Sequence, residues 1–472
     1  MTPVETLRGQ SIAVFGLGGS GISTVRALVE GGAEVTVWDD NVVARERAAH
    51  AGYRLVDLAR ADWKGFRLFV LSPGVPLTNP TPHWTVKLAN AAGVPIVGDI
   101  ELFSRERAAR APEAPFVAIT GTNGKSTTTA LIAHVLREAG RDVALGGNIG
   151  TPVLDLSPPA NARTHVIECS SYQIDLAPSL APSVGLLINV TPDHLDRHGD
   201  LARYAGIKER LAARSEIALV GVDDEICRDI YARLKERGGA RRVEAISGAE
   251  SPIADIFVSR RRVIARSESE PVVDLDDARA LRGAHNAQNA AFACGAARVL
   301  GVKREQIVRA FGSFPGLAHR MEEVACAGRV LFINDSKATN ADAAEKALLS
   351  FHDIHWICGG RPKEGGIESL RPLFARVAKA YLIGEATEEF AHTLDKAVPF
   401  EPCETLQAAI AAATHDAMGS KAREPVVLLS PACASFDQFA NFEARGNVFR
   451  AAVAELLNRR HAAAEPTIGG GA

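Results

Sequence analysis

Short apolar runs alternate with longer amphipathic stretches along the whole chain. In the first part, Ser11–Phe15, Glu34–Trp38 and 67–71 have the composition of buried strands, and a helix is expected between the first two, ending near Glu30. Buried strands separated by helices are typical of a parallel sheet that is covered on both faces. We therefore predict an α/β fold that begins with a Rossmann-like domain over residues 1–112.

The same alternation recurs twice more. A second parallel sheet is expected in a central domain over residues 113–316, and a third sheet in a Rossmann-like C-terminal domain over 317–472. The strands expected in these two sheets are the apolar runs 116–119, 164–167, 184–188, Val330–Asn334, 354–358 and Val426–Leu429. Residues 215–275 have the composition of further strands and carry no motif that we can interpret. A chain of 472 residues is long enough for about three domains.

The first strand of the central domain is followed by the segment Gly-Thr-Asn-Gly-Lys-Ser-Thr. Gly121 and Gly124 let the backbone approach a ligand closely, and a helix is expected to begin at Lys125. A helix N-terminus attracts phosphate, because its unpaired N–H groups and its dipole both favour an anion. Lys125 would reach the β- and γ-phosphates and the Ser126 hydroxyl would bind Mg²⁺. ATP binding to a P-loop is therefore the working hypothesis. Because the spacing is shorter than G-x-x-x-x-G-K-[ST], a glycine turn before an ordinary helix is the alternative.

A second glycine-rich segment lies near the N-terminus. Gly16–Gly21 has the pattern G-x-G-x-x-G after a strand, and Asp39 follows about 20 residues later, which is the dinucleotide fingerprint. Taken alone, this pattern indicates an NAD-dependent dehydrogenase. The central domain begins too early for the six strands of a full dinucleotide-binding domain, and the third strand ends in another loop, Ser72-Pro73-Gly74. We therefore expect a pocket for a nucleotide diphosphate, with glycines needed only for helix–strand packing as the alternative.

Polar residues gather where the central strands end. Asn148 lies in a glycine loop, Glu168 follows one expected strand, and Asp193-His194 follows the next. The carboxyl ends of parallel strands meet at one edge of a sheet, so these side chains are expected beside the phosphate loop. Mg²⁺ readily takes oxygen ligands and less often an imidazole. Glu168, Asp193 and His194 together predict a site for the metal of an ATP complex, although an Asp-His pair in a proline turn can also be a cap.

Three further side chains remain ambiguous in the sequence. Lys208 lies on an amphipathic helix expected at Leu201–Ala213, where a lysine is usually a solvated surface charge. Asn286 and Asn289 are three residues apart and so share one face of a small-residue helix. Their amides are equally suited to reading the edge of an adenine and to capping the helix.

Composition excludes several classes of protein. Hydrophobic residues make up 47% and charged residues 23% of the chain, as in soluble globular proteins. No apolar run approaches the roughly 18 residues of a membrane span, and the N-terminus has no targeting signal, so a cytoplasmic protein is expected. The seven cysteines are scattered, so they suggest neither a disulfide framework nor a zinc site. The net charge of −3 gives no support to a nucleic-acid partner.

The segment Gly121–Thr127 resembles the phosphate loop of the Mur ligases and of the related folylpolyglutamate synthetases. Four further stretches are similar to the members that add D-glutamate, and they span nearly the whole chain. These stretches are residues 71–74, 168–173, 335–340 and 429–442, of which the last, LSPACASFDQFANF, is the most specific. The Asp-Asn-Pro-Arg segment expected in members that add diaminopimelate or lysine is absent from the sequence.

The resemblance implies an ATP-dependent amide ligase of peptidoglycan precursor synthesis. ATP would phosphorylate the alanyl carboxylate of UDP-N-acetylmuramoyl-L-alanine, and the amine of D-glutamate would attack the acyl phosphate. The uridine nucleotide would bind residues 1–112, ATP residues 113–316 and the amino acid residues 317–472. The resemblance further implies two Mg²⁺ sites and a cytoplasmic monomer.

Residue roles also follow from the resemblance. Lys125, His194 and Lys208 would be catalytic, and Lys208 would be carbamylated so that it supplies a carboxylate to the second Mg²⁺. The metal ligands would be Ser126, Glu168, His194 and carbamylated Lys208. The ATP-binding residues would be Gly121, Thr122, Asn123, Gly124, Lys125, Ser126, Thr127, Asn289, Arg320 and Asp335. The substrate-binding residues would be Gly16, Gly18, Ser20, Asp39, Ser72, Pro73, Gly74, Asn148, Thr339, Lys363, Ser435, Phe436 and Phe442.

Three other functions compete with this interpretation. Another Mur ligase or a folylpolyglutamate synthetase-like ligase would share the phosphate loop but should lack residues 429–442 as written. A dinucleotide-dependent oxidoreductase is suggested by Gly16–Gly21 and would bind NAD(P)H. A non-enzymatic, ATP-gated binding protein would show no ATP hydrolysis dependent on an amino acid.

Overall fold

The computed structural model describes residues 1–237, 242–283 and 285–464. The chain forms two compact units: the first combines Met1–Asp277 with Asn286–Ser313, and the second combines Ala278–His285 with the chain from Phe314 onward. Among the described residues, no helix is both long enough and apolar enough to cross a membrane.

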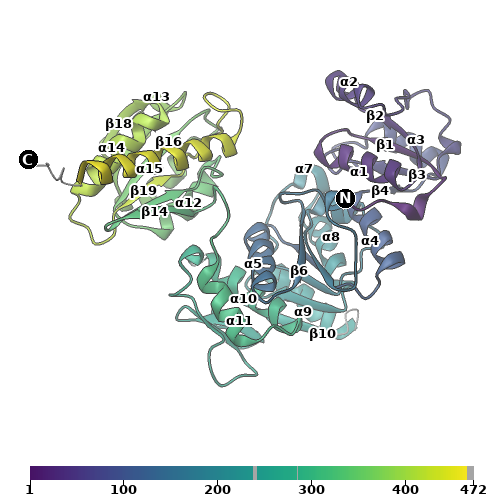
Figure 1. Ribbon diagram of the computed structural model, residues 1–472, viewed down its shortest axis with the longest axis horizontal. Helices are drawn as coiled ribbons and strands as arrows, with labels where there is room; N and C mark the ends of the chain where they lie inside the picture. Colours follow the sequence, from purple (N-terminus) through teal and green to yellow (C-terminus); the bar gives the residue numbers. More distant parts are fainter. Residues whose placement is uncertain (238–241, 284, 465–472) are drawn as a thin grey trace, which may run out of the picture. The chain divides into compact units, whose positions relative to one another are not determined.

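The N-terminal part of the first unit is built on a four-stranded parallel sheet with the order β2-β1-β3-β4 (Figure 1). Its strands are β1 (Ser11–Phe15), β2 (Glu34–Trp38), β3 (Leu68–Leu71) and β4 (Ile96–Val97). Its helices are α1 (Gly19–Glu30), α2 (Val42–His50), α3 (Trp84–Ala92) and α4 (Asp99–Arg110). Four strands agree with the expectation of less than a full dinucleotide-binding domain.

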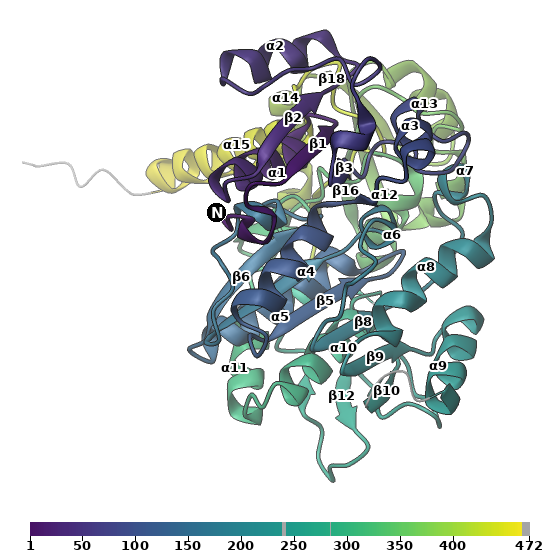
Figure 2. The same ribbon diagram turned by 90° about the vertical axis from the view of Figure 1, so that its right-hand side faces the viewer.

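The central part of the first unit is a nine-stranded sheet, ordered β13-β12-β11-β10-β9-β8-β5-β7-β6 (Figure 2). Its strands are β5 (Phe116–Thr120), β6 (Asp142–Gly147), β7 (Arg163–Glu168), β8 (Val184–Leu187), β9 (Ile217–Gly221), β10 (Arg242–Ile246), β11 (Ile256–Ser259), β12 (Arg262–Ala265) and β13 (Val273–Asp274). Strands β5 to β11 pair in parallel, and β12 and β13 are antiparallel additions at one edge.

Helices cover both faces of the central sheet. They are α5 (Lys125–Glu138), α6 (Ser171–Asp175), α7 (Leu195–His198), α8 (Leu201–Ala213), α9 (Glu225–Arg237), α10 (His285–Val299) and α11 (Arg304–Ser313). Apolar residues of α8 and α9 share a core with β8, β9 and β10. The expectation that residues 215–275 form further strands is confirmed by β9 to β13, and the polar 13-residue helix α9 lies among them.

The register of the central strands explains where the site lies. Ile119 of β5 is paired with Glu168 of β7, Glu168 with Gly147 of β6, and Thr120 of β5 with Leu187 of β8. Four strands therefore end side by side, and the loops that follow them meet at one edge of the sheet. The N-terminal sheet joins this part through a common apolar core that includes Val14, Phe103 and Phe116.

The second unit contains a six-stranded sheet with the order β14-β15-β19-β16-β17-β18, parallel except for β14. Its strands are β14 (Glu322–Ala327), β15 (Val330–Asn334), β16 (Ile354–Gly359), β17 (Val377–Ile383), β18 (Phe400–Glu404) and β19 (Val426–Leu429). Its helices are α12 (Ala341–Ser350), α13 (Thr387–Leu394), α14 (Leu406–Gly419) and α15 (Phe442–Ala464).

Successive residues of β15 show how this sheet is covered. Leu331 and Ile333 pack in a core with α12 and α13, whereas Val330 and Phe332 pack in a second core with α14 and α15. Side chains alternate between the two faces of a strand, so one apolar run supplies both cores. The predicted α/β class with three largely parallel sheets is confirmed, while the boundaries at residues 112 and 316 stay a prediction.

Candidate active site

The phosphate loop joins β5 to α5 and is closed by tight backbone contacts. Gly124 has a φ of +81°, and a Cβ atom there would lie 2.2 Å from Oδ1 of Asn289. At Gly121 a Cβ would come within 3.0 Å of Ile188. A left-handed φ and a close approach both favour glycine, so the turn itself requires Gly124 and leaves little room for a side chain at position 121. The predicted helix start at Lys125 is confirmed.

Asn189, two residues after the end of β8, holds the first half of this loop. Its Oδ1 accepts hydrogen bonds from the backbone N–H groups of Thr122 at 3.1 Å and Asn123 at 2.8 Å. The Thr122 hydroxyl donates to the carbonyl of Thr191 at 3.1 Å. These contacts prearrange the loop. An anion would therefore meet N–H groups in the first turn of α5, where a helix leaves them without intrahelical partners.

Two lysines converge on one carbonyl of the loop. Nζ of Lys125 donates to the Gly121 oxygen at 3.0 Å, and Nζ of Lys208 donates to the same oxygen at 2.7 Å. Lys208 is only 1% exposed, and burial, followed by the nearby Lys125 ammonium, lowers its pKa to about 7. The sequence-based interpretation of Lys208 as a surface charge is therefore wrong. A polyanion at the loop would relieve the repulsion between the two amines.

Glu168 is a buried carboxylate with one oxygen in use. Oε1 accepts a hydrogen bond from Nδ2 of Asn148 at 2.9 Å, so the structure brings these two predicted site residues together. Oε2 is buried and has no hydrogen-bond partner among the described residues. A buried carboxylate oxygen without a donor is costly, and a cation would satisfy it.

His194 lies at the start of α7 in a left-handed conformation, with φ 54° and ψ 30°. Its half-exposed ring has Nε2 at 3.3 Å from Oδ2 of Asp193. Among the described residues, no three His, Cys, Asp or Glu side chains are grouped closely enough to hold a metal by themselves. A metal here would therefore depend on other oxygen atoms, such as those of the Ser126 hydroxyl and of phosphate.

Asn289 supports the phosphate loop from behind. Its Oδ1 accepts from the Thr128 hydroxyl at 3.2 Å, and its Nδ2 donates to Oδ1 of Asn286 at 3.0 Å. Both asparagines are buried. From the sequence, Asn289 was expected to contact adenine or to cap a helix. Its support of the phosphate loop is a third role, which the sequence did not suggest.

The Gly16–Gly21 loop is closed by its own neighbours. The backbone N–H of Leu17 donates to Oδ2 of Asp39 at 2.6 Å, and the Ser72 hydroxyl donates to the Gly16 carbonyl at 2.8 Å. These predicted residues therefore meet at the carboxyl edge of the N-terminal sheet. Gly18 and Gly74 are exposed there, and Ser20 and Pro73 are partly exposed.

The remaining predicted residues belong to the second unit. Asp335 is 5% exposed, its Oδ2 accepts from Ser430 at 2.8 Å, and burial raises its pKa to about 7. The other residues differ in exposure: Ser435 is buried, whereas Phe436 is 64% exposed. Lys363 is exposed, and Arg320, Thr339 and Phe442 are partly exposed. That these side chains share a cleft with the first unit stays a prediction.

Sequence reasoning missed Arg445, a fully buried residue of α15. Its guanidinium donates to the hydroxyl and the carbonyl of Ser336 at 3.0 and 2.9 Å, and to the carbonyl of Cys433 at 3.1 Å. It thereby ties together the two turns that follow β15 and β19. The position of Asn189 after a strand could have identified it as a site residue. Nothing in the sequence indicates that Arg445 is buried.

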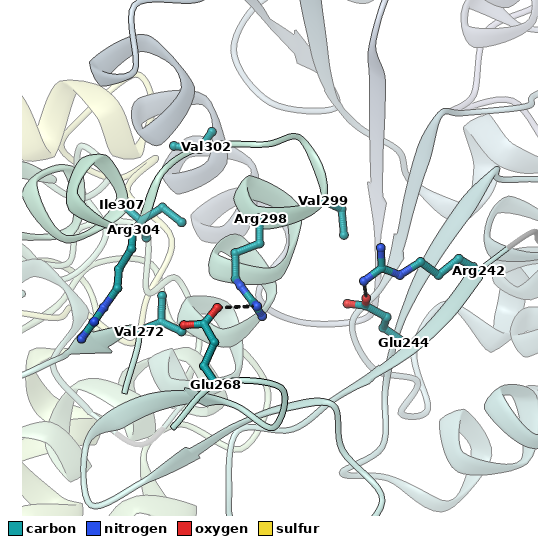
Figure 3. A pocket seen from close by; sticks show the side chains of 9 residues that line it. All are labelled: Arg242, Glu244, Glu268, Val272, Arg298, Val299, Val302, Arg304 and Ile307. Atoms are coloured by element: carbon teal, nitrogen blue, oxygen red, sulfur yellow. Dashed lines mark hydrogen bonds and ion pairs between the residues drawn. The ribbon is translucent and has the colours of Figure 1, made fainter. Parts of the chain in front are cut away.

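A pocket of about 260 Å³ lies at the corner of α10 and α11, and none of its lining residues belongs to the phosphate loop (Figure 3). Its arginines are paired with carboxylates: Arg298 with Glu268 at 2.6 Å, and Arg304 with Glu270 at 2.9 Å. Because these guanidinium groups already have anionic partners, the pocket does not compete with the phosphate loop as a triphosphate site.

Comparisons with known proteins identify consecutive domains of one family. Residues 10–98 match the family model described as "Mur ligase MurD-like, N-terminal domain". Residues 119–297 match "Mur ligase middle domain", and residues 319–433 match "Mur ligase, glutamate ligase domain".

Curated relatives match over nearly the full length. A protein of Rhizobium etli is 57% identical over 97% of this chain and 97% of its own length, and one of Rhizobium johnstonii is 58% identical over the same shares. A Brucella abortus protein is 57% identical over 97% of this chain and 98% of its own length. All three are named UDP-N-acetylmuramoylalanine--D-glutamate ligase.

Solved structures share the fold at low identity. The UDP-N-acetylmuramate-alanine ligase of Thermotoga maritima has a TM-score of 0.56 at 18% identity, covering 95% of this chain and 100% of its own. A UDP-N-acetylmuramoyl-L-alanyl-D-glutamate--2,6-diaminopimelate ligase has a TM-score of 0.58 at 18% identity, covering 85% of this chain and 94% of its own. The extent and identity of the curated matches show that this chain belongs to the Mur ligase family.

Proposed function

We propose that the protein is an ATP-dependent ligase that joins D-glutamate to UDP-N-acetylmuramoyl-L-alanine, as a monomer in the cytoplasm, during peptidoglycan precursor synthesis. The observation that carries this proposal is the pair of lysine amines, Lys125 and Lys208, on the Gly121 carbonyl of a phosphate loop. The names of relatives at 57–58% identity support the choice of substrates.

The first step converts a poor electrophile into a reactive one. A carboxylate oxygen of the alanyl group attacks the γ-phosphorus of ATP, the bond to the β–γ bridging oxygen breaks, and ADP leaves with the electron pair. Such a transfer needs positioned positive charge more than covalent help. Lys125 and the first turn of α5 would supply that charge, and Gly121–Thr127 would hold the phosphates.

In the second step the amine of D-glutamate attacks the acyl carbon. A tetrahedral intermediate forms and then collapses, with loss of phosphate and of a proton from nitrogen, to give the amide. Lys363, Thr339, Ser435, Phe436 and Phe442 would hold D-glutamate. A dicarboxylate needs a cation, and the exposed Lys363 can supply it.

The residues present fit a requirement for Mg²⁺, because Glu168 has a buried oxygen without a donor among the described residues. Ser126, Glu168 and His194 would hold one ion, and Lys208, once carbamylated, would contribute a carboxylate to a second. Bound Mg²⁺ would neutralise charge on the phosphate oxygens. A pKa near 7 leaves much of the Lys208 amine neutral at that pH, and only the neutral amine can add to carbon dioxide.

The nucleotide ends of both substrates would be bound elsewhere along the chain. Asn289, Arg320 and Asp335 would contact ATP. The uridine end of the other substrate would lie on the N-terminal sheet edge, with Asn148 close to its phosphates. The residues for that uridine end are Gly16, Gly18, Ser20, Asp39, Ser72, Pro73 and Gly74.

The test is phosphate release from ATP with Mg²⁺ and UDP-N-acetylmuramoyl-L-alanine, offering D-glutamate, L-glutamate, L-lysine and mesodiaminopimelate in turn. We expect release with D-glutamate. Release with L-lysine or mesodiaminopimelate in place of D-glutamate would refute the substrate assignment. Release that needs no amino acid would favour an ATP-gated binding protein, and NAD(P)H fluorescence that changes on titration would favour the oxidoreductase.

A further inference from the structure

Tyr172 and three side chains around its ring form a cluster that the proposed mechanism does not explain. The ring centroid of His198 lies 5.1 Å from that of Tyr172 in a stacked geometry, and that of His194 lies at 5.2 Å. The guanidinium carbon of Arg197 lies 4.7 Å from the centroid of the same ring. We call these four residues the Tyr172 stack. It joins α6, which follows Glu168, to α7, which begins after His194.

The Tyr172 stack holds a strained residue. A histidine in the left-handed region costs on the order of 1–2 kcal/mol, so its surroundings must determine this conformation. The His194 carbonyl accepts the backbone N–H groups of Arg197 at 3.0 Å and His198 at 3.1 Å. His198 is buried, its Nε2 is 2.9 Å from the Ser171 hydroxyl, and burial lowers its pKa. The His194 turn is thereby fixed to α6.

Arg197 connects the same turn to the N-terminal sheet. One terminal nitrogen donates to the Gly74 carbonyl at 3.0 Å, in the loop that follows β3. Its Nε is buried and has no hydrogen-bond partner among the described residues. The guanidinium is thus held by one carbonyl and one aromatic face, an arrangement that depends on where the Gly74 loop lies.

We infer that Arg197 is a positioning residue that couples the Ser72–Gly74 loop to the conformation of His194. This inference rests on the proposed function, in which the loop receives the uridine nucleotide and His194 is a metal ligand. Ordering the loop fixes the Gly74 carbonyl, which fixes the guanidinium on Tyr172 and so the turn that begins at His194. Binding of the sugar nucleotide would then prepare the metal site before ATP is cleaved.

The most direct test is hydrogen–deuterium exchange over residues 193–199 with UDP-N-acetylmuramoyl-L-alanine alone, without ATP or metal. In the wild type we expect slower exchange in this segment and in residues 72–76. In Arg197→Met, slower exchange should remain at 72–76 and disappear at 193–199. Equal protection of 193–199 in both proteins would overturn the inference. If the nucleotide protects neither segment of the wild type, the proposed function fails instead.

Kinetics give a second readout. Partners of a metal ligand typically affect metal affinity by 10–100-fold, so Arg197→Met should raise the Mg²⁺ concentration for half-maximal rate about tenfold, with KM for ATP unchanged. Arg197→Lys keeps a charge on Tyr172 and should be intermediate, because one ammonium cannot serve the ring and Gly74 together. The exposed Arg203 of α8 is the matched control, and Arg203→Met should match the wild type.

The conservative variant Arg197→Lys distinguishes a loss of coupling from a folding defect. If Arg197→Met does not fold, the comparison of Arg197→Lys with the wild type decides. Wild-type Mg²⁺ dependence together with wild-type exchange at residues 193–199 in Arg197→Lys would contradict the coupling.

Discussion

Two glycine loops in the first unit look alike in sequence and differ in what surrounds them. Gly16–Gly21 and Gly121–Lys125 each join a buried strand to a helix, and each needs glycine at a left-handed position, Gly16 with φ +92° and Gly124 with φ +81°. At the first loop a carboxylate, Asp39, accepts the backbone N–H of Leu17. At the second, two lysine amines converge on the Gly121 carbonyl.

The difference shows that a glycine turn at a helix N-terminus does not define a ligand by itself. Both loops offer N–H groups and the positive end of a helix dipole. An acid beside the first loop discourages a highly charged phosphate group and suits a ribose or base hydroxyl or N–H. Two amines beside the second loop favour a triphosphate. The charges therefore favour a polyanion at the second loop and a more neutral part of a nucleotide at the first, which stays a prediction.

Removing a positive charge from the second loop should have the largest effect. We expect Lys125→Ala to lower kcat/KM by about 10²-fold or more, because a cation that stabilises a transferring phosphoryl group is worth several kcal/mol. The measurement is phosphate release at varied ATP. Lys87→Ala, at an exposed lysine of α3, is the control and should match the wild type. A near-normal rate in Lys125→Ala would make the second loop structural, like any glycine turn.

Lys208→Ala should come next, with activity about 10- to 100-fold lower, as for the loss of a residue that contributes to metal binding. If a carbamate on Lys208 supplies a carboxylate, then added acetate or formate should restore part of the activity of Lys208→Ala. Full activity of Lys208→Ala without any additive would contradict a role in the reaction.

The lowered pKa of Lys208 also makes a stability prediction. The folded protein loses this proton above about pH 7, whereas the unfolded chain keeps it to about pH 10.5. Between these values the unfolded state binds more protons, so this lysine destabilises the fold fully below pH 7 and progressively less as the pH rises. Wild type should therefore gain melting temperature relative to Lys208→Met between pH 7 and pH 9.5. A pH-independent difference would mean that the amine titrates normally.

Much of this arrangement was predictable from local patterns. The apolar runs predicted β1, β2, β15 and β19 with their observed bounds, and the glycine–lysine segment predicted the start of α5. Polar residues after the strands predicted that Asn148 and Glu168 would lie at the same edge of the sheet, because parallel strands end at one edge, and the structure shows them hydrogen-bonded there.

Long-range packing was not predictable in this way. Lys208 reaches a carbonyl 87 positions earlier in the chain, and its helix gives only an amphipathic pattern. Asn289 lies 161 positions from Thr128, whose hydroxyl donates a hydrogen bond to the amide oxygen of Asn289. Such burial depends on how a helix docks on a sheet, which the local pattern of apolar and polar residues does not reveal. The resemblance to a family was therefore needed to point to Lys208.

Substituting one glycine in each loop, Gly124 and Gly18, should have a smaller effect than the lysine substitutions, and it tests how tightly each position is packed. Gly124→Ala places a methyl group 2.2 Å from Asn289 at a positive φ, so we expect a loss of about 1–3 kcal/mol in the free energy of unfolding and a higher KM for ATP. Gly18 has φ −69°, and a methyl group added there would meet no atom within 4 Å. Gly18→Ala should therefore change the free energy of unfolding by less than about 0.5 kcal/mol. Similar losses at both sites would show that the positive φ and the close approach to Asn289 do not determine the cost at Gly124.

A smaller effect than that of Gly124→Ala is expected at the acid of the first loop. Asp39 accepts the N–H of Leu17 at 2.6 Å and that of Asn41 at 2.8 Å, and in Asp39→Asn only one side-chain oxygen remains to accept either bond. A hydrogen bond to a charged group contributes roughly 1.5–3 kcal/mol, and part of that is kept, so we expect a loss of about 1 kcal/mol. KM for the uridine nucleotide should rise severalfold while KM for ATP stays constant, because the second loop has its own charges. An equal rise in both constants would show that the two loops do not act as separate nucleotide sites.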